Sequence, residues 1–282
     1  QKMHLRAPAK VNLGLVVGAK RPDGFHELVT KFATIGLCDD LVIAIDDDSS
    51  SGVSLEITGN EDLAADAIEA NLCVRAARLF LAEIGAGLSV RMQLTKRIPT
   101  GAGLGGGSSD AAAVFRAMSS LTGSPIGDER LAELAASLGS DVPFFLTGGV
   151  ALGRGRGEII EPIEETLVDG ILLVKPTASV PTAKAYGLLA ESRTSGRDLA
   201  DLSIALDEAS LHNDFQEPIA AAFPSIAGLL DRLNVLVGPD RCAMSGSGAA
   251  CFGLFNNPAS ANEAAALFAD VPFVWSGGFV GR

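Results

Sequence analysis

The chain has 282 residues, of which 48% are hydrophobic and 20% charged, a composition typical of a folded globular protein and not of a disordered one. It contains 22 lysines and arginines against 34 aspartates and glutamates, which leaves a formal net charge of -12. This balance argues against nucleic-acid binding through unselective positive charge, so an anionic ligand has to be bound by local groups.

The four cysteines form no CxxC pair and have no histidine at metal-ligand spacing. They are predicted to be buried thiols in a reducing compartment. The N-terminal residues lack the apolar core of a signal peptide. The uncharged stretch 242–262 is rich in Ser, Gly and Asn and contains Pro258, which predicts a buried strand, a loop and a helix start, not a membrane span. We therefore expect a cytoplasmic protein without a membrane or nucleic-acid partner.

In the first half of the chain, the apolar pattern predicts strands at residues 10–18, 25–35, 41–45, 53–58 and 88–94. Helical spacing predicts a helix over residues 67–84 that ends at Gly85, a second that runs from the glycine-rich stretch to Gly123, and a third over 131–138. Several strands followed by helices indicate an α+β layer, not an alternating parallel one.

In the second half, strands are predicted at 171–174, near 242, at 250–255 and at 273–275. Helices are predicted to begin at about residues 182, 213 and 224, with another over 259–268. The glycine- and charge-rich stretch Gly153–Glu158 is the predicted domain boundary. This gives domains at residues 1–158 and 159–282.

The stretch KRIPTGAGLGGGSSDAA, residues 96–112, has five glycines between Gly101 and Gly107. A strand, a glycine-rich turn and a helix start together favour phosphate, because helix N–H groups are free and absent Cβ atoms permit close approach. One or two glycines would suffice for a tight turn, and five cost backbone entropy.

Two other classes of glycine loop fit less well. Gly101, Gly103 and Gly106 satisfy GxGxxG, but the preceding strand alternates, and no acidic residue ends a second strand about 20 positions on. A Walker A loop requires lysine after its last glycine, where this chain has Ser108.

The segment PTGAGLGGGSSDAA resembles the phosphate-binding motif of the GHMP kinases, the superfamily of galactokinase, homoserine kinase and mevalonate kinase. Three more stretches resemble family motifs, in the family's order: residues 7–28 (APAKVNLGLVVGAKRPDGFHEL), 138–149 (LGSDVPFFLTGG) and 243–255 (AMSGSGAACFGLF). Within the superfamily, RPDGFHEL is similar to the kinases of the non-mevalonate isoprenoid pathway. The resemblance implies an α+β, two-domain GHMP kinase fold, with an N-terminal domain like domain 2 of ribosomal protein S5 and a C-terminal ferredoxin-like α/β domain.

The resemblance also implies a reaction, the ATP-dependent phosphorylation of the 2-hydroxyl of a methylerythritol linked to cytidine diphosphate, with Mg²⁺ beside the nucleotide. Lys10 and Asp141 correspond to the family's catalytic pair. Asp141 would accept the hydroxyl proton, and Lys10 would orient it and offset developing charge. The structural alternatives are a helix cap for Asp141 and a surface lysine for Lys10.

The remaining site residues follow from the same resemblance. Asn71 and Lys96 are expected near the nucleoside of ATP, and Ser109 matches a serine near magnesium, but no acidic metal ligand is assigned from the sequence. The ATP phosphates are assigned to Pro99, Thr100, Gly101, Ala102, Gly103, Leu104, Gly105, Gly106, Gly107, Ser108 and Ser109.

For the cytidine substrate, Phe25, His26 and Tyr186 are expected to stack on or read the base, with polar contacts from Asn12 and Thr182 and with Asp141 at the reacting hydroxyl. The family's usual residue at Phe25 is tyrosine; phenylalanine keeps the stacking face and loses the hydroxyl.

Two alternatives to this kinase stay open. One is homoserine kinase, and the other is a GHMP-fold sensor that binds a nucleotide or metabolite without catalysis. The joint presence of Lys10 and Asp141 in their motifs favours an enzyme.

Overall fold

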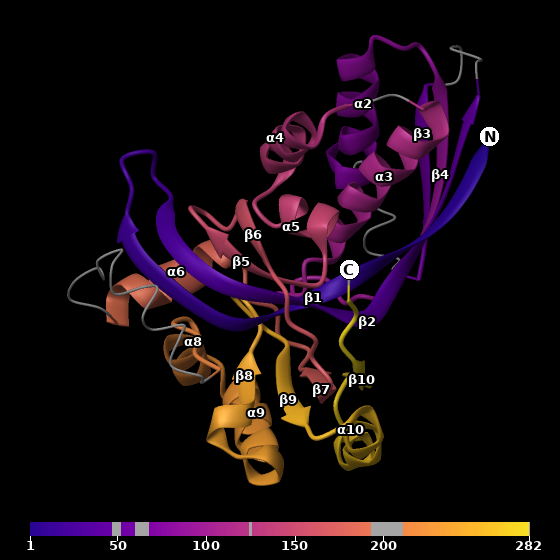
Figure 1. Ribbon diagram of the computed structural model, residues 1–282. Helices are drawn as coiled ribbons and strands as arrows, with labels where there is room; N and C mark the ends of the chain where they lie inside the picture. The colour runs from indigo at the N-terminus through magenta and orange to yellow at the C-terminus, as the bar shows by residue number, and fades with distance from the viewer. Residues whose placement is uncertain (47–51, 60–67, 124–125, 193–210, 282) are drawn as a thin grey trace. The chain divides into compact units, whose positions relative to one another are not determined.

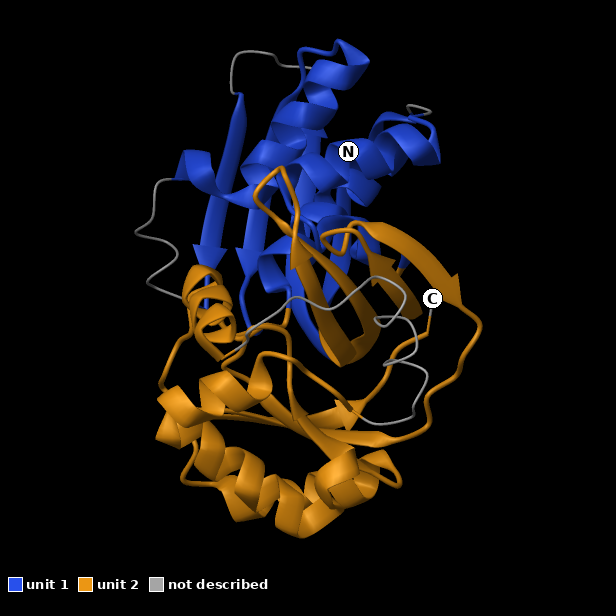
Figure 2. Cartoon of the chain, turned by 90° about the vertical axis from the view of Figure 1, so that its left-hand side faces the viewer, with its two compact units in different colours: residues 1–9, 37–98, 105–147 blue, residues 10–36, 99–104, 148–282 orange. Residues whose placement is uncertain are grey.

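The computed structural model describes residues 1–46, 52–59, 68–123, 126–192 and 211–281 (Figure 1). The chain forms two compact units, coloured in Figure 2: unit 1 comprises residues 1–9, 37–98 and 105–147, and unit 2 residues 10–36, 99–104 and 148–282. These units do not follow the predicted division at residue 158. The reason is that the long strands β1 (Lys2–Lys20) and β2 (His26–Asp46) each contribute residues to both units.

In unit 1, strand β4 (Ser89–Thr95) pairs with the Asp40–Asp46 end of β2 in antiparallel register and with β3 (Val53–Thr58) in parallel register. The predicted alternation holds from Val90 to Leu94, since Val90, Met92 and Leu94 are buried and Arg91 and Gln93 are exposed; Ser89 is buried as well. The 3-10 turn η1 (Ile68–Ala70) precedes α2 (Leu72–Ile84), which packs against β3 and against α3 (Gly106–Thr122). Helices α4 (Asp128–Leu138) and α5 (Val142–Thr147) complete the unit.

In unit 2, a four-stranded antiparallel sheet has the order β10-β7-β9-β8. Its strands are β7 (Gly170–Lys175), β8 (Cys242–Met244), β9 (Cys251–Phe255) and β10 (Phe273–Gly278). Helices α9 (Pro224–Val237) and α10 (Pro258–Ala265) pack on this sheet, as Figure 1 shows. Short 3-10 turns follow each of them, η2 (Pro239–Arg241) and η3 (Ala266–Phe268).

Unit 2 also contains helices α6 (Thr182–Ser192) and α8 (Gln216–Ala222), which contact each other, and a second set of paired strands. There, Thr30–Ala33 of β2 pairs with β5 (Val150–Arg154), which in turn pairs with β6 (Ile159–Ile163). The sequence analysis did not predict β5 or β6. Strand β6 is largely exposed, with Ile159 at 59%, and therefore lacks the buried face that produces an alternating pattern.

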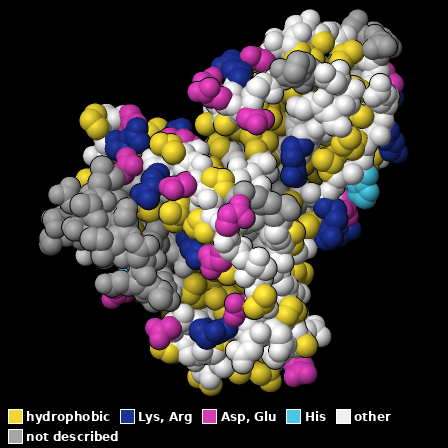
Figure 3. Space-filling view, in the orientation of Figure 1, with side chains coloured by type: hydrophobic (Ala, Val, Ile, Leu, Met, Phe, Trp, Pro, Cys, Tyr) yellow, Lys and Arg dark blue, Asp and Glu magenta, His cyan; other side chains and the backbone are white. Residues whose placement is uncertain are grey.

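The α+β class is confirmed, with both units built from helices and sheets. None of the helices in the described ranges is long and apolar enough to cross a membrane. On the face shown in Figure 3, acidic and basic side chains are interspersed. Where its residues are described, this face therefore has no large surface of one charge that would attract an anionic ligand, so such a ligand has to be bound by specific side chains and backbone groups.

Candidate active site

The glycine-rich stretch forms a turn that enters α3. Gly101, Gly103 and Gly105 have φ angles of 58°, 75° and 71°, a left-handed conformation that glycine adopts readily. Gly105 caps the helix, and Ser109 N donates to Gly105 O at 2.9 Å. The N–H groups of a helix's first turn have no acceptor within the helix, and the dipole favours negative charge there. This geometry supports the predicted phosphate site.

The segment Ala243–Phe255 holds the glycine turn from the other end of the sequence. Ala249 N donates to Gly101 O at 3.2 Å, and Ser245 Oγ donates to Gly103 O at 3.0 Å. A Cβ at Gly103 would lie only 2.0 Å from Ser245 O, so a side chain at this position would force the two segments apart. The Gly101–Gly103 part of the glycine turn and the Ala243–Phe255 segment thus form one structure in unit 2.

Lys10 lies at the base of this structure and is 3% exposed, so it is not the surface lysine of the alternative interpretation. Its Nζ donates to Asn12 Oδ1 at 2.6 Å, and Asn12 Nδ2 donates to Thr30 Oγ1 at 2.7 Å. The backbone is fixed as well: Lys10 N donates to Leu104 O at 3.0 Å, and Asn12 N donates to Ser245 Oγ at 3.3 Å. The predicted catalytic lysine and the predicted substrate ligand Asn12 therefore share one buried network.

Two residues that the sequence analysis did not single out support this network. Asn213 Nδ2 donates to Met244 O at 2.7 Å and to Gly246 O at 2.8 Å, while Asp214 Oδ2 accepts from Val17 N at 2.7 Å. Both side chains are buried. The available signal was an adjacent Asn–Asp pair between His212 and Phe215, but the backbone groups that it bonds lie in remote segments of the sequence.

The segment before α6 also contacts both motifs. Thr182 is the first residue of α6, and its Oγ1 lies 3.4 Å from Ser247 Oγ. Ser179 Oγ donates to Gly101 O at 3.5 Å. Thr182 thus lies beside the Ala243–Phe255 segment. Its contact with a substrate stays a prediction.

The structure brings His26 and Tyr186 together. Their rings are stacked, with centroids 5.0 Å apart and planes 23° apart, and Tyr186 meets Phe215 edge-on at 4.9 Å. Phe25 is instead in contact with the guanidinium of Arg156. A base sandwiched between Phe25 and Tyr186 stays a prediction.

Asp141 belongs to unit 1 and immediately precedes α5. Val142 N donates to Gly139 O at 3.2 Å, and a Cβ at Gly139 would lie 3.9 Å from Ser108 Oγ. The segment that carries Asp141 therefore lies beside the start of α3. Lys10 is in unit 2, and the pairing of Lys10 with Asp141 stays a prediction.

Lys96 forms the centre of a buried charge cluster in unit 1. Its ammonium forms ion pairs with Asp39 and, at 2.7 Å, with Asp110 Oδ2. The side chains of Lys96, Asp39 and Asp110 are 4%, 0% and 3% exposed. Asp39 Oδ1 also accepts from Ile98 N at 2.8 Å. The cluster therefore fixes both the segment that precedes the glycine turn and the helix that follows it.

Burial shifts the titration of this cluster. It raises the pKa of Asp110 to about 7; the Lys96 ammonium acts in the opposite direction, and the Asp39 carboxylate acts in the same direction as burial. Burial alone would lower the pKa of Lys96, but the two carboxylates outweigh it, and the pKa is raised. Lys96 thus stays charged, and the Asp110 carboxyl binds its proton more tightly than an ordinary aspartate does.

Asn71, the other residue predicted near the nucleoside, is the N-cap of α2, and its Oδ1 accepts from Cys73 N at 2.9 Å. Among the described residues, its Nδ2 group has no hydrogen-bond partner and is available to a ligand. Lys96 would have to exchange a carboxylate partner to bind a nucleotide through its ammonium. Both nucleoside contacts stay predictions.

The start of α3 carries two polar groups that fit a bound Mg²⁺-ATP. Ser109 Oγ and Asp110 Oδ1 are buried and lack a hydrogen-bond partner in the described structure. No group of three His, Cys, Asp or Glu side chains in the described ranges is arranged to hold a metal ion. Mg²⁺ commonly binds through one or two protein groups and the phosphates of its substrate, so the residues present fit a metal that arrives with ATP.

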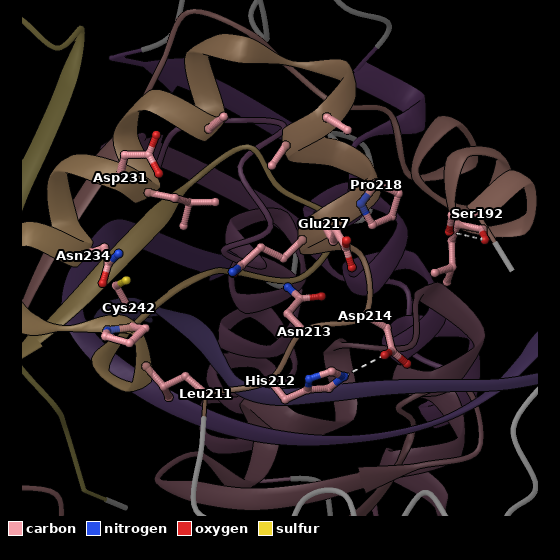
Figure 4. Close-up of a pocket in the computed structure, with 17 residues that line it drawn as sticks. Ser192, Leu211, His212, Asn213, Asp214, Glu217, Pro218, Asp231, Asn234 and Cys242 are labelled. Atoms are coloured by element: carbon pink, nitrogen blue, oxygen red, sulfur yellow. Dashed lines mark hydrogen bonds and ion pairs between the residues drawn. The ribbon is translucent and has the colours of Figure 1, made fainter.

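Unit 2 has a cavity of ≈ 780 Å³, which none of the predicted site residues lines (Figure 4). His212 and Asp214 point toward one another at its wall, with Nε2 and Oδ1 2.7 Å apart. Asn213 and Asp214 use their side chains to bind backbone groups, which is a structural role. The glycine turn, and not this cavity, is therefore the candidate active site.

Two family models match the chain. The model of the GHMP kinases N terminal domain matches residues 71–149, and that of the GHMP kinases C terminal domain matches residues 187–269. The chain belongs to the GHMP kinases, which are small-molecule kinases.

Within the GHMP kinases, the chain is similar to several individual enzymes and solved structures. A 4-diphosphocytidyl-2-C-methyl-D-erythritol kinase of Solibacter usitatus is 42% identical over 266 residues, covering 90% of this chain and 81% of that protein. The enzyme of the same name from Methylacidiphilum infernorum is 41% identical, covering 89% of this chain and 85% of its own. A crystal structure of 4-(cytidine 5'-diphospho)-2C-methyl-D-erythritol kinase superposes with a TM-score of 0.82 at 38% identity, over 99% of this chain and 100% of that one. Homoserine kinase from Cytophaga hutchinsonii, at 19% identity and a TM-score of 0.71 over 100% of this chain and 94% of its own, shares the fold.

Proposed function

We propose that this chain transfers the γ-phosphoryl group of ATP to the 2-hydroxyl of 4-diphosphocytidyl-2-C-methyl-D-erythritol, a step of the non-mevalonate isoprenoid pathway. The observation that carries the proposal is the joined structure of Lys10, Asn12, the glycine turn and Ser245, in a chain 42% identical to a kinase of that name. The four buried free cysteines support a cytoplasmic location.

Phosphoryl transfer depends mainly on alignment and charge stabilisation. The glycine turn and the first N–H groups of α3 would bind the phosphates of ATP, and Ser109 would lie beside the Mg²⁺ that accompanies them. Magnesium, when bound, offsets the negative charge of the phosphates. Asp141 would accept the proton of the substrate hydroxyl, and Lys10, already held by Asn12, would orient Asp141 and offset charge on the transferring group.

The cytidine end would bind in unit 2, where Phe25, His26 and Tyr186 supply aromatic surface and Thr182 a hydroxyl group. This part of the proposal separates the chain from GHMP kinases that phosphorylate smaller alcohols.

The test is ADP release with three acceptors offered separately: the cytidylylated methylerythritol, homoserine and mevalonate. We expect turnover only with the first. Turnover on homoserine or mevalonate without the first would reject the substrate assignment, and nucleotide binding without turnover on any acceptor would favour a sensor.

A further inference from the structure

Phe25 follows a tight turn that is held by three hydrogen bonds of its backbone groups. Gly24, with φ 88°, donates its N–H to Arg21 O at 3.0 Å, and Arg21 N donates to Phe25 O at 2.6 Å. Asp23 Oδ1 accepts from Phe25 N at 3.1 Å. The backbone at Phe25 is therefore fixed, whereas the residue itself is 50% exposed.

A second turn, between β5 and β6, is bonded to the first. Gly155 N donates to Glu27 Oε1 at 3.1 Å, and Leu28 N donates to Gly155 O at 2.8 Å. Glu27 Oε2 also pairs with Arg21 Nη1 at 3.3 Å. One carboxylate, that of Glu27, thus links the two turns and sets their spacing.

Arg156 extends from the second turn over the ring of Phe25, with its guanidinium carbon 4.6 Å from the ring centroid. Glu158 anchors it: Arg156 N donates to Glu158 Oε2 at 2.6 Å, and Arg156 Nε lies 3.4 Å from Glu158 Oε1. A cation over an aromatic face is attracted by the ring's quadrupole. Arg156 therefore covers one face of Phe25 and restricts the ring's rotation.

We propose that Arg156 is a positioning residue for the nucleotide substrate, which holds the Phe25 ring so that its opposite face receives a pyrimidine base. The inference rests on the proposed function, since it takes Phe25 as part of the base site. A half-exposed ring that moved freely would have to be ordered when the base stacks, and that ordering would reduce affinity. Phenylalanine has no hydroxyl group to anchor it by a hydrogen bond, so the guanidinium is the group that orders the ring.

Steady-state kinetics of the full chain give the first test. Arg156→Ala should raise the KM for the cytidylylated substrate about 3- to 10-fold and leave the KM for ATP and kcat unchanged. Arg154→Ala is the matched control, because Arg154 is the last residue of β5, directly before this turn, and pairs with Glu161 at 3.7 Å. Arg156→Lys should restore part of the loss, since it keeps a cation near the ring. A KM equal to that of Arg154→Ala would overturn the proposal.

Calorimetry with cytidine and CDP gives the second test. Both ligands carry the base but only CDP carries phosphates, so the two affinities separate a loss of base stacking from a loss of phosphate binding. Arg156→Ala should weaken both by the same factor and should add nothing in a Phe25→Ala background. Weakening of CDP alone, still present without Phe25, would mean a direct phosphate contact and would overturn the positioning role. Absence of wild-type turnover would count against the proposed function, whereas this binding cycle decides the role of Arg156 separately.

Discussion

Lys96 Nζ lies 2.7 Å from Asp110 Oδ2, and the two side chains are only 4% and 3% exposed. The ion pair joins the end of β4 to the first turns of α3, on either side of the glycine turn. Asp39 adds a second carboxylate, so the buried cluster holds two acids and one base. Because these charges are buried, the cluster should contribute measurably to the free energy of unfolding of the chain and to its pH dependence.

The first prediction concerns pH. Because burial raises the folded-state pKa of Asp110 to about 7, above its unfolded value, the folded state binds this proton more tightly. The stabilisation is present in full below the unfolded pKa and is lost as pH rises through about 7. Between pH about 5 and about 8, the free energy of unfolding of the wild type should fall more than that of Asp110→Asn. Urea unfolding across this range is the measurement, and parallel profiles would contradict the assignment.

The second prediction removes the base of the cluster. Lys96→Met leaves two buried carboxylates without their cation, and breaking such a buried pair costs about 3–5 kcal/mol. Urea unfolding near neutral pH should show this loss, whereas Lys20→Met, at an exposed position, should be close to neutral. If the Met variant keeps its stability and loses only ATP affinity, Lys96 acts as the nucleoside ligand predicted from the resemblance.

The third prediction tests Asp141 as the proton acceptor. Asp141→Asn should preserve folding and ATP binding and lower kcat by roughly 10²- to 10⁴-fold, the usual effect of a positioned acid or base. Asp128→Asn is the matched control, since Asp128 also lies at the start of a helix, α4, and is exposed. Equal, near-normal kcat values in the two variants would show that Asp141 is only a helix cap.

The fourth prediction concerns the glycine turn. Gly103→Ala places a Cβ 2.0 Å from Ser245 O and requires an alanine at φ 75°, so the turn must move. We expect the KM for ATP to rise at least about tenfold. Gly127→Ala provides the control, because nothing lies within 4 Å of a Cβ there and its φ is −60°. An unchanged ATP affinity in a folded Gly103→Ala protein would place the phosphates elsewhere.

The fifth prediction concerns the base site. Tyr186→Ala should raise the KM for the cytidylylated substrate roughly 5- to 150-fold, which corresponds to about 1–3 kcal/mol of base stacking, with little change in the KM for ATP. Tyr186→Phe keeps the ring that contacts His26 and Phe215 and should be mild. Circular dichroism has to confirm folding first. Equal losses for both substrates would make Tyr186 a core residue only.

Local patterns determined part of this structure. The alternation of Val90, Met92 and Leu94 predicted β4, because the side-chain period of a strand is visible within a few residues. The glycines from Gly101 to Gly107 predicted a turn before a helix, because this signal too lies within a few consecutive residues. Helix α3 begins at Gly106. The resemblance in four short motifs was sufficient to indicate the family, which the comparisons confirm.

Tertiary structure decided the rest. Residues 25–35 and 41–45 were predicted as separate strands, but β2 is continuous through Gly36, because β5 pairs with one part of it and β4 with the other. Asn213 bonds the carbonyl of Gly246, and Asp39 meets Lys96 across 57 positions of sequence. Buried polar groups need hydrogen-bond partners, and which groups pair depends on how distant segments pack. A local sequence pattern does not contain this information.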